Sequence, residues 1–173
     1  YDAIIYAADN DVLIVNAAGN DGTDIDTKNI YPNDQVDNGA EISNNFLTVG
    51  ALNYKYGEEL IARFSNYGKI NVDVFAPGVK IYSTVPNNKY RHLQGTSMAS
   101  PNVAGVAALI RSYYPKLKAA QVKQILMSSG LSITSKVIIP GDKNITNTLS
   151  EVTTSGKIVN AYNALIMAEM MSK

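Results

Sequence analysis

The chain has 173 residues, of which 46% are hydrophobic and 17% charged, a composition that excludes a disordered tail or a fibre and suits one globular domain. Fifteen Lys and Arg residues balance fifteen Asp and Glu residues, and no apolar run approaches the roughly 20 residues that span a bilayer, so neither nucleic acid nor a membrane is expected as a partner. Cysteine is absent and histidine occurs once, which excludes disulfides and thiol nucleophiles and leaves a single imidazole for proton transfer.

The first half of the chain predicts one helix and several short strands. Apolar residues at helical spacing predict a helix over residues 2–8. Runs of apolar or β-branched residues, each bounded by turn-forming residues, predict strands over residues 12–15, 46–49, 72–75 and 80–84. Residues 21–45 are polar and rich in Asn and Asp, and a loop of this length often carries function.

The second half predicts three helices. Residues 101–113 are apolar on every face and mostly small, which indicates a buried helix. Residues 119–128 place Val122 and Ile125 on one face and Lys123 on the polar face, and a final helix is expected from about residue 157. Apolar strands interleaved with helices favour an α/β fold with a mainly parallel sheet that helices cover on both faces.

A segment rich in Asn and Gly, residues 16–22, directly follows the first predicted strand. Asn20 would therefore stand at the carboxyl end of a strand, the edge where open α/β sheets bind ligands. Its carboxamide could point N–H donors at a developing oxyanion. A simple turn is the competing interpretation, because Asn and Gly are common where strands end.

A second segment, residues 95–101, precedes the predicted buried helix. Ser97 would lie just before or within the first helical turn, with Pro101 near the helix start. Free backbone N–H groups and the helix dipole would stabilise negative charge there, so Ser97 is a candidate nucleophile whose own N–H could bind an oxyanion. The competing interpretation is a helix cap, the usual role of Ser before a helix.

Together these segments resemble the subtilisin-like serine peptidases, or subtilases. The resemblance covers nearly the whole chain in the family's order and implies a three-layer subtilisin-like fold. It also implies that residues 1–173 are the C-terminal portion of one peptidase domain that is incomplete at its N-terminus. The matching motifs are AAGN at 17–20, FSNYG at 64–68, VDVFAPG at 72–78, GTSMASPNVAG at 95–105 and GKIVNA at 156–161.

The resemblance implies a serine endopeptidase that hydrolyses peptide bonds through an acyl-enzyme on Ser97, with Asn20 as the side-chain donor of the oxyanion hole. It further implies a protein or peptide substrate and a secreted or cell-envelope location. The pocket for the substrate residue before the scissile bond would be lined by Ala17, Ala18 and Gly19, with Tyr31 and Pro32 as weaker candidates.

The family's catalytic Asp and His motifs are missing from this chain. Asp-x-Gly and His-Gly-Thr precede the oxyanion Asn in the family, whereas the one Asp-x-Gly here begins at Asp37, after Asn20, and is interpreted as a turn. The single histidine, His92, lies in a predicted strand over residues 90–94 and is interpreted as solvated. We therefore expect the chain alone to be inactive and to associate with itself through the truncated sheet edge.

Two alternatives remain at this point. One is a pseudo-peptidase or peptide-binding module without a complete triad, and the other is a structural domain in which Ser97 is a cap and Asn20 a turn residue. No metal or other cofactor is expected in this chain. Calcium is possible in the full-length protein, because it often stabilises this family, and Asp21, Asp24 and Asp26 could supply ligands, but a solvated loop is the preferred interpretation.

Overall fold

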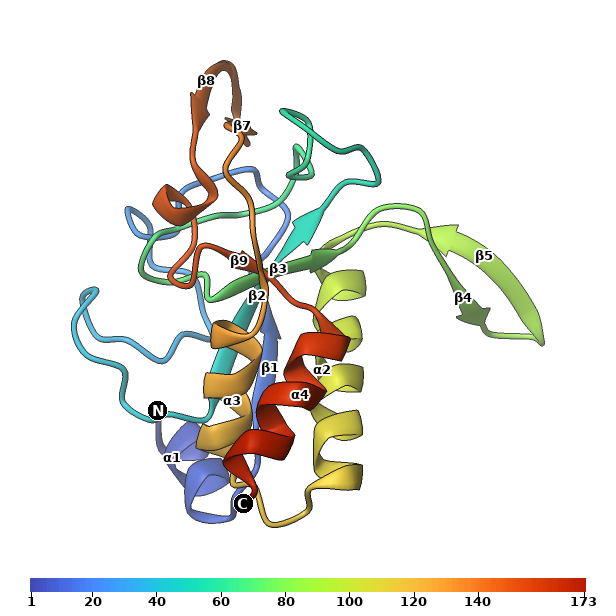
Figure 1. Cartoon of the computed structure of the whole chain (residues 1–173). Helices are drawn as coiled ribbons and strands as arrows, with labels where there is room; N and C mark the ends of the chain where they lie inside the picture. Colours follow the sequence, from blue (N-terminus) through green and yellow to red (C-terminus); the bar gives the residue numbers. More distant parts are fainter.

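A computed structural model describes all 173 residues and contains one five-stranded sheet and two separate hairpins (Figure 1). The sheet has the order β1-β2-β3-β9-β6, and only β6 is antiparallel to its neighbour. Its strands are β1 (Ile14–Ala17), β2 (Phe46–Leu52), β3 (Val74–Pro77), β9 (Lys157–Ile158) and β6 (Leu131–Ser132). The hairpins join β4 (Ile81–Val85) to β5 (Lys89–Leu93) and β7 (Val137–Ile139) to β8 (Asp142–Asn147).

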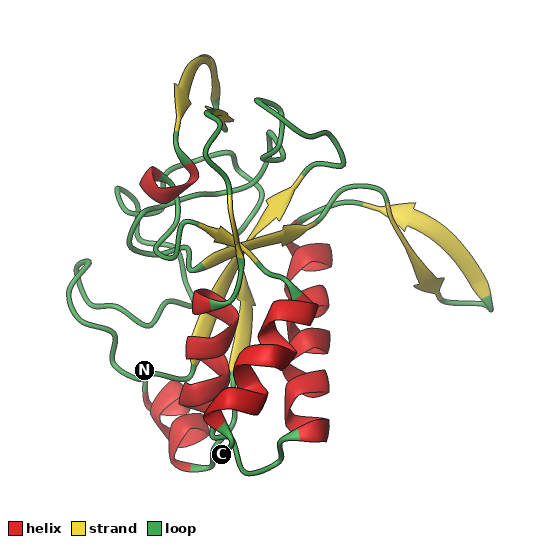
Figure 2. Cartoon of the chain, viewed as in Figure 1, coloured by secondary structure: helices red, strands yellow, loops and turns green.

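Three of the four helices, α2, α3 and α4, pack together beside the sheet, and loops gather beyond the carboxyl ends of its strands (Figure 2). The fold is α/β with a mainly parallel sheet, as the sequence predicts. None of the helices combines the length and the apolar character that crossing a bilayer requires. The helices are α1 (Asp2–Asp9), α2 (Thr96–Tyr113), α3 (Ala119–Ser128) and α4 (Ala161–Met171), with a 3-10 turn at Leu149–Glu151.

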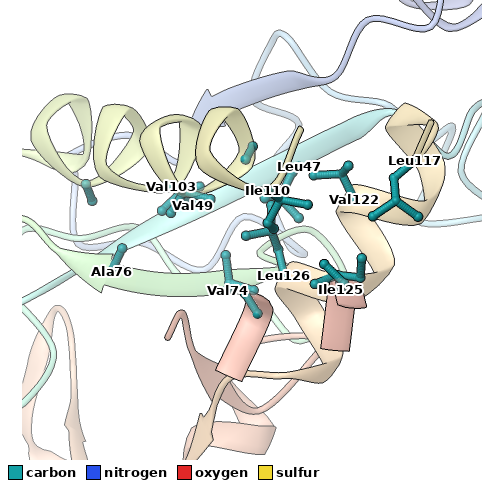
Figure 3. Close-up of a cluster of buried hydrophobic side chains, with 14 of the residues drawn as sticks. Leu47, Val49, Val74, Ala76, Val103, Ile110, Leu117, Val122, Ile125 and Leu126 are labelled. Carbon is teal, nitrogen blue, oxygen red and sulfur yellow. The ribbon is translucent and has the colours of Figure 1, made fainter. Parts of the chain in front are cut away.

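The larger core joins the sheet to α2 and α3 (Figure 3). Val103 and Ile110 of α2 pack with Val49 of β2 and Val74 of β3, and all four side chains are fully buried. A second buried cluster, which includes Phe75, lies under the loops and β7. Every residue of β2 is buried, which explains why this strand is a continuous apolar run without alternation.

Several element boundaries differ from those predicted. The helix predicted over 101–113 begins at Thr96, so Pro101 lies inside it and leaves the Ser97 carbonyl without its usual donor four residues later. The run at 80–84 does form a strand, but β4 belongs to an exposed hairpin and not to the main sheet. The strands predicted at 12–15 and 72–75 each begin two residues later, and the last helix begins at Ala161.

Lys123 was predicted on the solvent face of its helix, and this is wrong. Its side chain is only 6% exposed, and its Nζ lies 2.6 Å from Glu41 Oε2, 3.9 Å from Asp34 Oδ2 and 4.0 Å from Asp73 Oδ1. A buried ammonium needs such partners, because burial removes its hydration. The cluster ties α3 to the long loop and to the residue that precedes β3.

Because Asp34 is buried in this cluster, the free energy of unfolding should depend on pH, and an Asp34→Asn variant should reduce that dependence. Burial raises the pKa of Asp34 to about 6, although Lys123 opposes the shift. The folded chain therefore binds this proton more tightly than the unfolded chain, so the associated stability is complete below about pH 4 and is lost as the pH rises through about 6. Urea unfolding measures the free energy of unfolding at about pH 4.5 and 7.5. Its decrease between the two pH values should be smaller in the variant by roughly 1–3 kcal/mol. An unchanged decline would contradict this assignment.

Candidate active site

The structure brings Asn20 and Ser97 to the same place, where the loop after β1 meets the first turn of α2. The connection is Thr96, whose N–H donates to Asn20 Oδ1 at 2.9 Å and whose hydroxyl donates to the same oxygen at 3.1 Å. Ser97 is the next residue and the second of α2. These hydrogen bonds fix the position of two segments that are more than 70 residues apart in the sequence.

The Ser97 side chain is exposed, and its hydroxyl makes no hydrogen bond within the chain. Gly95 is the N-cap residue of α2, and no side chain caps this helix, so the interpretation of Ser97 as a cap is wrong. Its backbone N–H also lacks a partner, as expected for the first turn of a helix. A free hydroxyl and a free N–H on one residue suit a nucleophile that also helps to bind an oxyanion.

The Asn20 carboxamide has a fixed orientation. The Thr96 N–H can only donate, so the Asn20 atom that faces it must be the oxygen. The Nδ2 group therefore points the other way, and it makes no hydrogen bond within the chain. A turn residue would not need this arrangement. Asn20 Nδ2 and the Ser97 N–H are both free to donate to a negatively charged oxygen.

Asn66 holds the loop that carries Asn20, a role that the sequence analysis missed. Its fully buried side chain accepts hydrogen bonds from Asp21 N–H at 3.0 Å and Thr23 N–H at 3.2 Å, and it donates to Ala18 O at 2.8 Å. The only signal for it in the sequence is its position within the FSNYG motif. Asn66 is thus a positioning residue for the loop on both sides of Asn20.

Gly19 is required by conformation and by space. Its φ is +101°, and a Cβ placed there would lie 2.4 Å from Asn66 Nδ2. Its N–H donates to the Thr96 hydroxyl at 3.1 Å. Gly19 therefore leaves room for both Thr96 and Asn66 to hydrogen-bond the same loop.

Of the residues predicted to line a substrate pocket, only Ala18 and Pro32 line the same cavity. Ala18 is buried and shares a small cavity of about 10 Å³ with Pro32, room for about one water molecule. Ala17, the last residue of β1, does not line this cavity, and neither does Gly19. Tyr31 is 72% exposed and also lies outside it.

His92 does not contact Ser97. It lies on β5, where its Nδ1 is 3.0 Å from Lys80 O and its ring centroid is 4.9 Å from that of Tyr82. The side chain is exposed on a strand, as the sequence predicts. Asp37 is exposed and has a φ of +50°, which fits the predicted turn.

Two of the three carboxylates named as possible calcium ligands, those of Asp24 and Asp26, already have structural partners, whereas the Asp21 carboxylate makes no hydrogen bond or ion pair within the chain. Both oxygens of Asp26 accept hydrogen bonds, from the N–H groups of Ile70 and Asn71 at 2.9 Å each, and Asp24 Oδ1 accepts from Asp26 N–H at 2.9 Å. No group of three or more His, Cys, Asp or Glu side chains is arranged to hold a metal ion. These contacts stabilise the loop itself.

Comparison with known proteins matches residues 1–158 to the model of the Subtilase family. Subtilisin DY of Bacillus licheniformis is 42% identical over 123 residues, which are 70% of this chain and 40% of the relative. Two proteins of Bacillus subtilis (strain 168) also match. The cell wall-associated protease is 37% identical over 134 residues (78% of this chain, 13% of the relative), and the major intracellular serine protease is 43% identical over 114 residues (65% and 32%).

A solved structure, that of the prenylagaramide maturation protease PagA, has the same fold. It superposes with a TM-score of 0.71 at 29% sequence identity, over 96% of this chain and 54% of that chain. The chain thus spans about 40% of the length of subtilisin DY and about half of the PagA chain.

An Asn66→Ala variant should loosen the loop around Asn20. The N–H groups of Asp21 and Thr23 lose their acceptor, so their hydrogen exchange should accelerate and the free energy of unfolding should fall by roughly 1–3 kcal/mol. Asn71→Ala is the matched control, because Asn71 is also buried but its side chain bonds Ile25, Asp26 and Asn38, farther along the loop, and not Asp21 or Thr23. Equal exchange at Asp21 and Thr23 in both variants would contradict the assigned role.

Proposed function

The chain belongs to the subtilase family, and on that premise we propose that the full-length protein is a serine endopeptidase whose nucleophile is Ser97. The Ser97 hydroxyl would attack the carbonyl carbon of the scissile peptide bond. Asn20 Nδ2 and the Ser97 N–H would donate to the resulting oxyanion, and water would then hydrolyse the acyl-enzyme.

One observation carries this proposal: Thr96, the residue before Ser97, binds the carboxamide oxygen of Asn20, so that the N–H donors of Asn20 stay free. Oriented donors lower the barrier because they need no reorganisation as charge develops on the oxygen. A module that only binds peptides would need neither the free hydroxyl of Ser97 nor the fixed amide of Asn20.

The proposal requires a general base that these 173 residues do not provide. A serine hydroxyl is a weak nucleophile at neutral pH without an imidazole to accept its proton. The one imidazole, His92, is engaged with Lys80 O on the β4–β5 hairpin. We propose that the 173 residues are the serine-bearing part of a larger peptidase domain whose catalytic His and Asp lie elsewhere in the protein.

The proposed substrate is a protein or peptide, which is the substrate class of a peptidase family. Ala17, Ala18 and Gly19 would line the pocket for the residue before the scissile bond, and their small size would leave room for a bulky side chain. A larger side chain at Ala18 would also enter the cavity that Ala18 shares with Pro32.

We further propose a secreted or cell-envelope location. Among the relatives, one is named as cell wall-associated and another as intracellular, so the family works in both settings. Recovery of the protein only from the cytosolic fraction of its source cells would contradict export.

The free edge of β1 supports the proposed self-association of the isolated chain. β1 pairs with β2 on one side only, and its four residues are just partly buried. An unpaired strand edge is a ready template for another strand. A sedimentation coefficient that stays at the monomer value even at high concentration would contradict this proposal.

In the full-length protein, Asn20→Ala should lower kcat by about 100- to 1,000-fold with little change in KM. The size of this loss is taken from a subtilisin, whereas its direction follows from the geometry of Asn20. Steady-state hydrolysis of a peptide substrate measures it, and Ser97→Ala provides the inactive control. Absence of turnover by the wild-type full-length protein would favour a pseudo-peptidase that binds peptides without cutting them.

The 173-residue chain alone should not react with a fluorophosphonate probe at neutral pH. Ser97 is accessible, but its hydroxyl has no hydrogen-bond acceptor within the chain, and the one imidazole, His92, contacts Lys80 O on the β4–β5 hairpin. Labelling is followed by mass spectrometry, with Ser97→Ala as the control for reaction at other hydroxyls. Rapid modification of Ser97 would show that the isolated chain activates its serine.

A further inference from the structure

The base of the β4–β5 hairpin lies within the candidate site. The Gly95 N–H donates to Gly78 O at 2.9 Å and closes this base, and Ser97 follows two residues after Gly95. A Cβ placed on Gly95 would lie 3.6 Å from Asn20 Nδ2, so the same base also lies beside the proposed oxyanion donor. A peptide bond held at Ser97 and Asn20 is therefore next to the point where the hairpin leaves the domain.

Beyond its base the hairpin has no partner in the fold. Each of its two strands pairs only with the other, so the outer edge of β5 is unpaired, and no residue of either strand is buried. Figure 1 shows the hairpin standing away from the sheet and the helices. Tyr82 and Tyr90 stack with their ring centroids 5.7 Å apart, yet they are 62% and 57% exposed. Exposed aromatic side chains of this kind are typical of a contact surface.

No carboxylate matches the positive charge of the hairpin. Residues 78–95 include Lys80, Lys89 and Arg91 but no Asp or Glu. None of the three cations forms an ion pair. Lys80 Nζ lies 3.9 Å from the centre of the Tyr54 ring, a contact that leaves its charge in place. Lys89 and Arg91 are exposed, and their donors are free to bind carboxylates.

The free edge and the free cations occur on the same strand. Lys89 and Arg91 are two residues apart on β5, so their side chains point to the same face of the hairpin, while Tyr90 points to the other. A peptide that added to the edge of β5 as a third strand would place alternate side chains on each face. Acidic residues two positions apart would then meet both cations, and the side chain between them would lie on the face of Tyr90.

We infer that the outer edge of β5 binds an extended acidic segment of the protein substrate, with Asp or Glu at alternate positions facing Lys89 and Arg91. This inference rests on the proposed peptidase function. Arg91 lies six residues before Ser97 and Lys89 eight. Extended chains rise by nearly the same distance per residue, so a substrate that runs along β5 from Ser97 places these acidic residues about six to eight positions from the scissile bond.

The first test uses the full-length protein and internally quenched peptides with one common cleavage sequence. A Glu-Ser-Glu or a Gln-Ser-Gln segment is placed about six to eight residues before or after the scissile bond, and kcat/KM is measured for each pair. On one side the Glu peptide should be preferred by roughly 5-fold, mainly through a lower KM, and added salt should reduce this preference. The double variant Lys89→Gln with Arg91→Gln should bring the ratio close to one. Both side chains are exposed, so the variant should fold.

Lys116→Gln with Lys136→Gln is the charge-matched control. Both residues are exposed, form no ion pair and lie outside the hairpin. This variant should keep the preference for Glu. A preference absent on both sides of the scissile bond, or one that survives in the Lys89 and Arg91 variant, would overturn the inference.

A binding measurement separates this inference from the proposed function. In full-length Ser97→Ala, fluorescence anisotropy should show tighter binding of the Glu-Ser-Glu peptide than of the Gln-Ser-Gln peptide. Cleavage of both peptides by the wild-type protein at equal rates would defeat only this inference. Tighter binding of the acidic peptide without cleavage by the wild-type protein would defeat the proposed function and leave the acidic-peptide site on β5. Displacement of the bound peptide by single-stranded RNA at lower concentrations than by free acidic peptide would identify a nucleic-acid ligand and overturn the inference.

Discussion

Thr96 makes the contact on which the candidate site depends. Its N–H and hydroxyl both donate to the Asn20 carboxamide oxygen, and its hydroxyl also accepts a hydrogen bond from Gly19 N–H. An amide has its acceptor and its donors on opposite sides, so holding the oxygen of Asn20 also aims its NH₂ group. Without Thr96, an exposed carboxamide could rotate, and a donor that must be ordered before charge develops would lose that order.

The rest of the fold keeps this contact in place. The Ser100 hydroxyl donates to Val15 O at 3.0 Å, which fixes the first turns of α2 to β1. Further along α2, Val103 and Ile110 are buried against the sheet, so the helix cannot shift without opening the core. Asn66 holds the other side of the loop from within the protein. The core thus fixes both segments from below, and the free groups, Asn20 Nδ2 and the hydroxyl and N–H of Ser97, lie on the exposed side of the site.

The sequence predicts local features of this molecule better than long-range ones. The bounds of α3 agree with its apolar periodicity, and Ser97 and Asn20 can be found because each belongs to a motif on a predictable element. The burial of Lys123 could not be predicted, because its partner Glu41 lies 82 residues away in a loop without periodicity. Apolar character alone also cannot assign β4 to an exposed hairpin, since a short strand looks the same in either sheet. The role of Asn66 depends on backbone groups that only the folded loop brings together.

The most direct test of the central claim is a crystal structure of the full-length protein with a peptide boronic acid bound. The account predicts a tetrahedral boronate on Ser97 Oγ, with one boronate oxygen at about 3 Å from both Asn20 Nδ2 and the Ser97 nitrogen. The Asn20 oxygen should still accept from Thr96. A boronate bound to another residue, or to Ser97 with Asn20 turned away from it, would contradict the account.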